Sequence, residues 1–146
     1  MQLTKNFTLS EFVNSQTASK NNIDNSIPEV LIPSIKVVAE YLQLIRDSIG
    51  VPIVVTSGYR SSKLNKLVGG TANSAHTRGE AADFFSPGLS LKSLYNKIVA
   101  MEKAKLFPPF DQLIFEGTWI HIGLTEPRRR QTLLKTAKGY QKIDHI

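Results

Sequence analysis

Two residues of the kind that bind metal ions lie close together in the middle of the chain. His76 is followed seven positions later by Asp83, and most of the residues between them are small. Imidazole nitrogen and carboxylate oxygen both suit Zn²⁺, and a catalytic zinc site uses about three protein ligands and a water. His121, in the second half of the chain, is the third ligand that we predict. The chain has no cysteine, so any such site must use His, Asp or Glu.

This spacing alone leaves a simpler interpretation open. His76, Asp83 and His121 could be three separate polar residues of the core or surface, because a lone buried histidine is more often hydrogen-bonded than metal-bound. The remaining histidine, His145, lies one residue from the C-terminus. We expect it to have no part in the site.

The local pattern predicts how these side chains are positioned. Residues 81–85 predict a strand that contains Asp83, with His76 on the loop before it. Residues 112–116 and 119–123 predict a β-hairpin around Gly117-Thr118.

In a hairpin with a two-residue turn, Ile114 pairs with His121. Side chains alternate between the faces of a strand, so Glu116 and Trp119 share the face of His121. A register error of one residue would reverse this arrangement.

Apolar periodicity and turn residues predict the elements around this centre. In chain order they are a short capped helix after Thr8, a loop over residues 15–27, a core helix over 28–49, a strand over 51–56, a short helix from Ser61 or Ser62 through Leu67, and a helix that begins after Ser90.

Bulk composition fits one folded domain over residues 1–146, with a basic C-terminal segment at about 126–146. Apolar residues make up 41% of the chain, which excludes disorder as its overall state. The formal net charge of +6 favours an anionic partner such as nucleic acid, cell-wall polymer or membrane surface. No apolar run approaches the roughly 20 residues of a membrane span, and the N-terminus has no secretory signal pattern.

A set of short motifs resembles the M15 metallopeptidases. In chain order the motifs are Ser57-Gly58-Tyr59-Arg60, Asn65, Gly69-Gly70, Ser74-x-His76-x-x-Gly79-x-Ala81-x-Asp83, Asp111-Gln112-Leu113-Ile114 and Trp119-Ile120-His121. The resemblance runs from about Phe7 to Gly123 and is greatest to the small phage and prophage branch of D-alanyl-D-alanine carboxypeptidase-like peptidases. It implies an α+β fold of the hedgehog and D-Ala-D-Ala peptidase type, with a central antiparallel sheet and flanking helices.

The resemblance also implies roles for single residues. The family's zinc ligands correspond to His76, Asp83 and His121. The arginine of the Ser-Gly-Tyr-Arg motif corresponds to Arg60, which in relatives contacts the scissile carbonyl oxygen or a substrate carboxylate. Ser74 either binds a substrate carboxylate or orients the His76 loop.

The general base is where the sequence departs from better-known relatives. Some have an acidic residue three positions before the last histidine, where this chain has Thr118, and others have a histidine two positions before it, where this chain has Trp119. We therefore predict Glu116 as the base, from its place on the hairpin face of His121. Asp111 is the second candidate and could equally be structural; Glu80 is the third. Trp119 lines the cleft or belongs to the core.

The resemblance implies a zinc-dependent peptidase that cuts peptides of bacterial peptidoglycan, as a D,D-carboxypeptidase or an endopeptidase. With no export signal, a phage lysis or entry enzyme such as an endolysin fits, made in the cytoplasm and then released or carried on the virion. We expect a monomer that binds the wall stem peptide. The alternative is a non-catalytic wall-binding or virion structural protein on the same scaffold. A nucleic-acid role has only charge in its favour, since the chain has no RNP-like, helix-turn-helix or zinc-finger motif.

Overall fold

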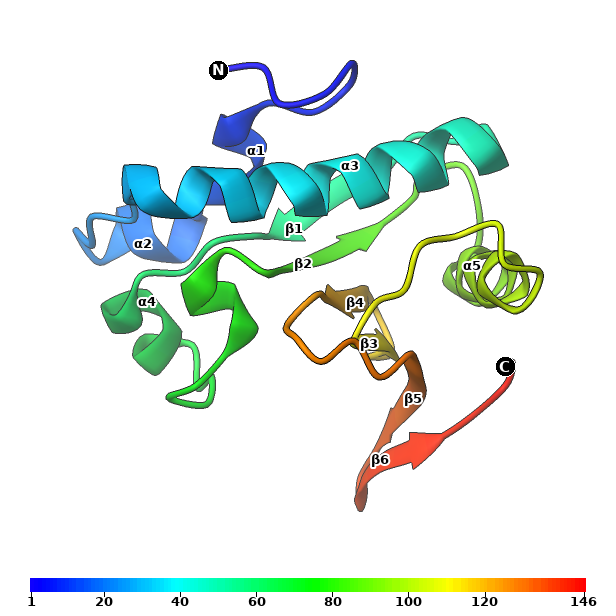
Figure 1. Ribbon diagram of the computed structural model, residues 1–146. Coiled ribbons are helices and arrows are strands. Elements are labelled where there is room, and N and C mark those ends of the chain that lie inside the picture. The colour runs from blue at the N-terminus through cyan, green and yellow to red at the C-terminus, as the bar shows by residue number, and fades with distance from the viewer.

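The computed structural model describes residues 1–146 and contains five α-helices, two short 3₁₀ helices and six strands (Figure 1). In chain order these are α1 (Leu9–Val13), α2 (Gln16–Lys20), η1 (Glu29–Leu31), α3 (Ile32–Ile49), β1 (Val54–Ser57), α4 (Ser62–Leu67), η2 (Ala75–Arg78), β2 (Ala81–Phe85), α5 (Leu91–Lys103), β3 (Gln112–Phe115), β4 (Ile120–Gly123), β5 (Gln131–Thr136) and β6 (Gly139–Lys142).

The six strands form one mixed sheet in the order β1-β2-β4-β3-β5-β6. Every neighbouring pair is antiparallel except β3 and β5, which are parallel. β4 ends at Gly123, opposite the start of β3 at Gln112. The short segment that follows β4 therefore returns the chain to the start of β3, and β5 runs alongside it in the same direction. The α+β class is confirmed. The sheet was predicted to be antiparallel, and it is antiparallel except for the parallel β3–β5 pair.

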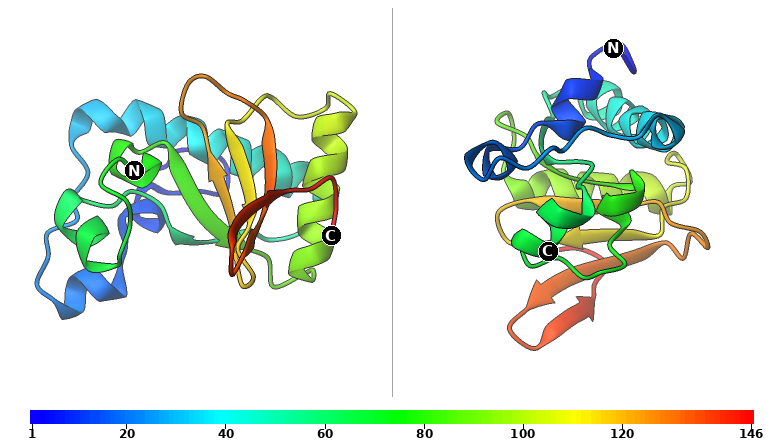
Figure 2. Two further views of the ribbon diagram at one scale, coloured as in Figure 1. Left: turned by 90° about the horizontal axis from the view of Figure 1, so that it is seen from below. Right: turned by 90° about the vertical axis from the view of Figure 1, so that its left-hand side faces the viewer.

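Helices α3 and α5 pack against one face of this sheet and enclose the core (Figures 1 and 2). The strands send alternate side chains into it, including Ala82 and Phe84 of β2 and Leu113 of β3, which are each fully buried. The residues between them, such as Asp83 and Ile114, point to the opposite face, where the cavity described below lies. The period-2 alternation of the strands thus separates the core from the candidate site.

Local capping explains where the helices near the site begin. Ser61, Ser74 and Ser90 precede α4, η2 and α5, and each side-chain oxygen accepts a hydrogen bond from a backbone N–H in the first turn. The helix predicted over 28–49 consists of η1 followed by α3. None of the helices combines the length and the apolar content that a membrane crossing requires.

Three predicted segments differ from the structure. The strand expected over 51–56 is β1, which begins only at Val54 and ends at Ser57. The segment 15–27 was expected to be a loop, but it contains α2, where the Ser15 side chain accepts from the Ala18 N–H. The segment is polar and its helix buries only Ala18, so it has no apolar periodicity from which a helix could be predicted. The segment 126–146 was described only as basic, and it contributes β5 and β6 to the sheet.

Candidate metal centre

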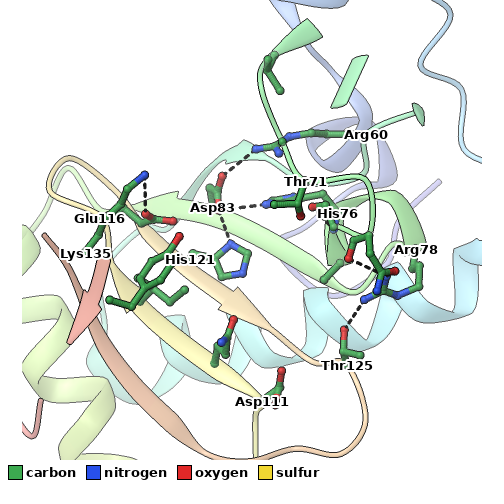
Figure 3. Close-up of a pocket in the computed structure, with 18 of the residues that line it drawn as sticks. Arg60, Thr71, His76, Arg78, Asp83, Asp111, Glu116, His121, Thr125 and Lys135 are labelled. Atoms are coloured by element: carbon green, nitrogen blue, oxygen red, sulfur yellow. Dashed lines mark hydrogen bonds and ion pairs between the residues drawn. The ribbon is translucent and has the colours of Figure 1, made fainter. Parts of the chain in front are cut away.

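The structure brings together the three predicted ligand residues from separate elements. His76 lies in η2, Asp83 in the middle of β2, and His121 in β4. Because Asp83 is the direct cross-strand partner of His121, their side chains lie on the same face of the sheet. One ligand atom from each of the three residues lies within 4.8 Å of the other two, so the cluster has the size and donor types of a metal site (Figure 3).

Hydrogen bonding fixes which nitrogen of His76 faces the cluster. Its Nδ1 lies 2.7 Å from the carbonyl oxygen of Gly58, which can only accept, so Nδ1 carries the proton. The unprotonated Nε2 then lies 3.3 Å from Asp83 Oδ1. Two acceptors that face each other at this distance need a cation or an extra proton between them. The donor set therefore fits a metal ion, and the Gly58 carbonyl orients the ligand as outer-shell partners do.

The Asp83 carboxylate contacts His76, His121 and Arg60. Its Oδ1 lies 2.9 Å from His121 Nδ1, and its Oδ2 accepts from the guanidinium of Arg60 at 3.3 Å. Burial opposes the ionisation of this carboxyl, but its contacts with His121 and His76 outweigh it, so the pKa of Asp83 lies below its ordinary value. Asp83 is thus held as the anion that a metal ligand must be.

Arg60 is held in place by three side chains. Besides its contact with Asp83, its Nε donates to Ser57 Oγ at 3.0 Å and its Nη1 donates to Asn65 Oδ1 at 3.3 Å. Burial lowers the pKa of Arg60, and the negative charges of Asp83 and Glu116 oppose that shift. With 17% of its side chain exposed, the guanidinium stays a fixed cation at the edge of the cavity.

The cluster opens into a cavity of about 550 Å³ on the sheet face opposite α3. The side chains that line it include Ser74 from the His76 loop and Glu116, Trp119 and Asp111 from the hairpin region. The hairpin register is as predicted, with Ile114 opposite His121, and so Glu116 and Trp119 share the face of His121. Ser74 accepts the His76 N–H at 3.2 Å and so orients the loop while also lining the cavity.

Glu116 is the candidate base with no hydrogen-bond partner. Its Oε1 is buried and accepts no hydrogen bond, and the nearest cation, Lys135 Nζ, is 3.9 Å away. Burial raises the pKa of Glu116, and the neighbouring Asp83 charge adds to this shift, while the proximity of His121 and Lys135 opposes it. A carboxylate with no committed partner, facing an open cavity, is free to exchange a proton.

The other two acidic candidates are already paired. Asp111 accepts two hydrogen bonds from the guanidinium of Arg129, at 2.6 and 2.9 Å, and this contact lowers the pKa of Asp111. Glu80 accepts from Arg78 at 2.7 Å and does not line the cavity. Both carboxylates therefore have structural partners, and only Glu116 is left uncommitted.

Sequence reasoning did not place Lys135 and Tyr140 at the cavity, although both line it. Lys135 and Tyr140 come from β5 and β6, whose residues were not assigned to strands. The signal was present in Gln131–Thr136, a run with β-branched residues, followed by the Lys138-Gly139 turn. Gly139 adopts a φ of 110°, which suits glycine at such a turn.

Comparison with known proteins bears on the same residues. The comparison with curated proteins finds no match to this chain. A family model described as Peptidase M15 matches residues 5–123, a stretch that contains Arg60, the three clustered candidate ligands and Glu116. Because that match covers most of the 146 residues, the chain belongs to the Peptidase M15 family.

Proposed function

We propose that this protein is a zinc-dependent peptidase that hydrolyses peptide bonds of bacterial peptidoglycan. One observation carries the proposal. The buried His76 and Asp83 and the partly buried His121 form a cluster that opens into a cavity in which the Glu116 carboxylate has no hydrogen-bond partner. Membership of the M15 peptidases supports peptide hydrolysis as the reaction.

The chain's own residues divide the chemistry among them. Zinc, when bound by His76, Asp83 and His121, would polarise the peptide carbonyl and acidify a water. Glu116 takes a proton from the attacking water and delivers one to the departing amine. Arg60, a fixed cation, stabilises negative charge on the carbonyl oxygen or holds a substrate carboxylate. Ser74 and Trp119 bind the substrate from the cavity wall.

Peptidoglycan is the proposed substrate because the net charge of +6 attracts an anionic wall polymer. We propose that the protein reaches the wall as a phage lysis or entry enzyme, released by another factor or carried on a virion. It would act there as a D,D-carboxypeptidase or as an endopeptidase at a bond next to a D-residue.

Mass spectrometry of muropeptides digested by the zinc-loaded protein tests the proposal and identifies the bond. We expect new products with wild-type protein and none after chelation. Glu116→Gln should bind zinc normally yet lose most turnover, because the amide cannot accept the proton. Glu80→Gln is the matched control, since Glu80 lies outside the cavity and should leave turnover intact. Full activity in Glu116→Gln would remove Glu116 from the mechanism.

The alternative is a wall-binding or virion structural protein without catalysis. It is favoured by the position of Thr118, which is an exposed turn residue where some relatives carry their acidic base. Tight binding to purified walls with no release of amino groups, from walls of several bond chemistries, would support this alternative over the peptidase.

A further inference from the structure

The β5–β6 hairpin forms a wall of the cavity that the family match does not include. The match ends at residue 123, and the hairpin spans residues 131–142. It extends the sheet beyond β3, as the orange and red strands of Figure 1 show. Parallel pairing of β5 with β3 sets Leu134 opposite Phe115, and the next residue along each strand brings Lys135 beside Glu116.

Lys135 and Tyr140 form a cross-strand pair on the cavity side of this hairpin. They are direct partners in the β5–β6 register, so their side chains lie on one face. Both line the cavity, with 55% of the Lys135 side chain and 57% of Tyr140 exposed. The Tyr140 hydroxyl makes no hydrogen bond within the protein. An exposed aromatic ring beside an exposed ammonium can both pack against a ligand and donate hydrogen bonds to it.

Lys135 differs from the other cations that line the cavity. Arg60, Arg78 and Arg129 each donate a hydrogen bond to a carboxylate, at 3.3, 2.7 and 2.6 Å. Lys135 reaches only to 3.9 Å from Glu116, which is beyond hydrogen-bond distance (Figure 3). Its only partner is this long ion pair with Glu116, so its three N–H donors make no hydrogen bond within the protein. Four cations against three carboxylates also leave the lining positive before any metal binds.

We propose that the Lys135–Tyr140 pair is a subsite for a carboxylate of the substrate peptide, separate from the position at Arg60. Lys135 donates to the carboxylate, and the Tyr140 ring packs against the adjoining peptide. This inference rests on the proposed peptidase function, because it identifies which peptides that site prefers. Peptides whose carboxylate is replaced by a carboxamide should bind less tightly.

Binding measured without turnover tests the subsite. The ligands are synthetic wall stem peptides in which each free carboxyl group is amidated in turn, titrated calorimetrically into chelated, metal-free protein. We expect wild type to prefer one carboxylate over its amide by about two- to fivefold, the range of a partly exposed ion pair. Lys135→Met should abolish that preference. Tyr140→Ala should weaken the binding of both peptides of that pair alike.

Lys138→Met is the matched control, because Lys138 lies in the turn of the same hairpin and does not line the cavity. It should keep the wild-type preference. Equal affinity of wild type for every peptide pair, absence of binding, or a preference that survives in Lys135→Met would overturn the subsite. Since no turnover is involved, these outcomes differ from failure of the proposed function, which is the absence of cleavage by the zinc-loaded wild type.

Discussion

Gly58 offers the sharpest test of how the fold supports the metal centre. A Cβ atom at this position would lie 2.4 Å from the carbonyl oxygen of Phe12, 2.8 Å from its Cα and 2.9 Å from its Cβ. The Phe12 side chain is completely buried, and the Tyr59 N–H donates to the same carbonyl at 2.7 Å. The backbone of Phe12 therefore cannot retreat, and in Gly58→Ala the residues that follow β1 must move instead.

Two effects of Gly58→Ala can be estimated separately. Overpacking of this kind costs about 1–3 kcal/mol of folding free energy, which lowers Tm by roughly 3–10 °C in a domain of this size. The same movement carries the Gly58 carbonyl away from His76 Nδ1, now 2.7 Å away. Loss of such an outer-shell contact costs about 10–100-fold in metal affinity.

The assay is thermal unfolding of the metal-free protein, followed by zinc titration against a competing chelator. Gly88→Ala is the control, because its new Cβ would approach side-chain atoms alone, those of Val51 at 3.3 Å and of Pro52 at 3.5 Å, and no backbone atom. That variant should keep wild-type zinc affinity. Wild-type Tm in Gly58→Ala would refute the steric argument. A lowered Tm with unchanged zinc affinity would refute the role of the carbonyl in orienting His76.

Three further predictions concern charge and metal. Zinc at about 100 times its dissociation constant should stabilise the protein by about 2.7 kcal/mol, or roughly 5–10 °C in Tm; His121→Ala should lose this shift, whereas His145→Ala, outside the cluster, should keep it. In metal-free protein, the Glu116 pKa should exceed its ordinary value because burial raises it, and zinc should lower it again; a ¹³C titration of the carboxyl, with and without zinc, measures both. Asp111→Asn should lower stability at neutral pH. Arg129 depresses the Asp111 pKa, so the difference in free energy of unfolding between variant and wild type should be full above the unfolded-state pKa of about 4. This difference should close as pH falls through the folded-state pKa. A difference that persists in acid would count against the Asp111–Arg129 contact.

Much of the site could be predicted because its residues lie in strong local patterns. The strand over 81–85 was predicted with its observed bounds, and the hairpin turn fixed which residues face His121. Strand alternation then determined that Glu116 shares that face. These inferences needed only the two-residue period of a strand and the geometry of a short turn.

Contacts between distant segments could not be read in this way. The Gly58 carbonyl reaches His76 from 18 positions away, and no periodicity encodes that hydrogen bond. The parallel pairing of β5 with β3 depends on the path taken by residues 124–130. The basic residues there looked like a solvated charge run, yet Arg129 binds Asp111 and Arg130 binds Glu102.

Asp111 and Glu116 show why the environment, and not residue type, favours Glu116 as the proposed base. Both are acidic, and both line the same cavity from the region of β3. Arg129 reaches Asp111 with two hydrogen bonds, which stabilise the anion and lower its proton affinity. Lys135 Nζ lies 3.9 Å from Glu116 Oε1, which is too far for a hydrogen bond. Burial therefore dominates at Glu116 and raises its proton affinity. A base must accept a proton and give it up again, which a carboxylate locked to a guanidinium does poorly. The segment that follows the family match thus affects both acids, because Arg129, just before β5, hydrogen-bonds to Asp111, whereas Lys135 of β5 makes no hydrogen bond to Glu116.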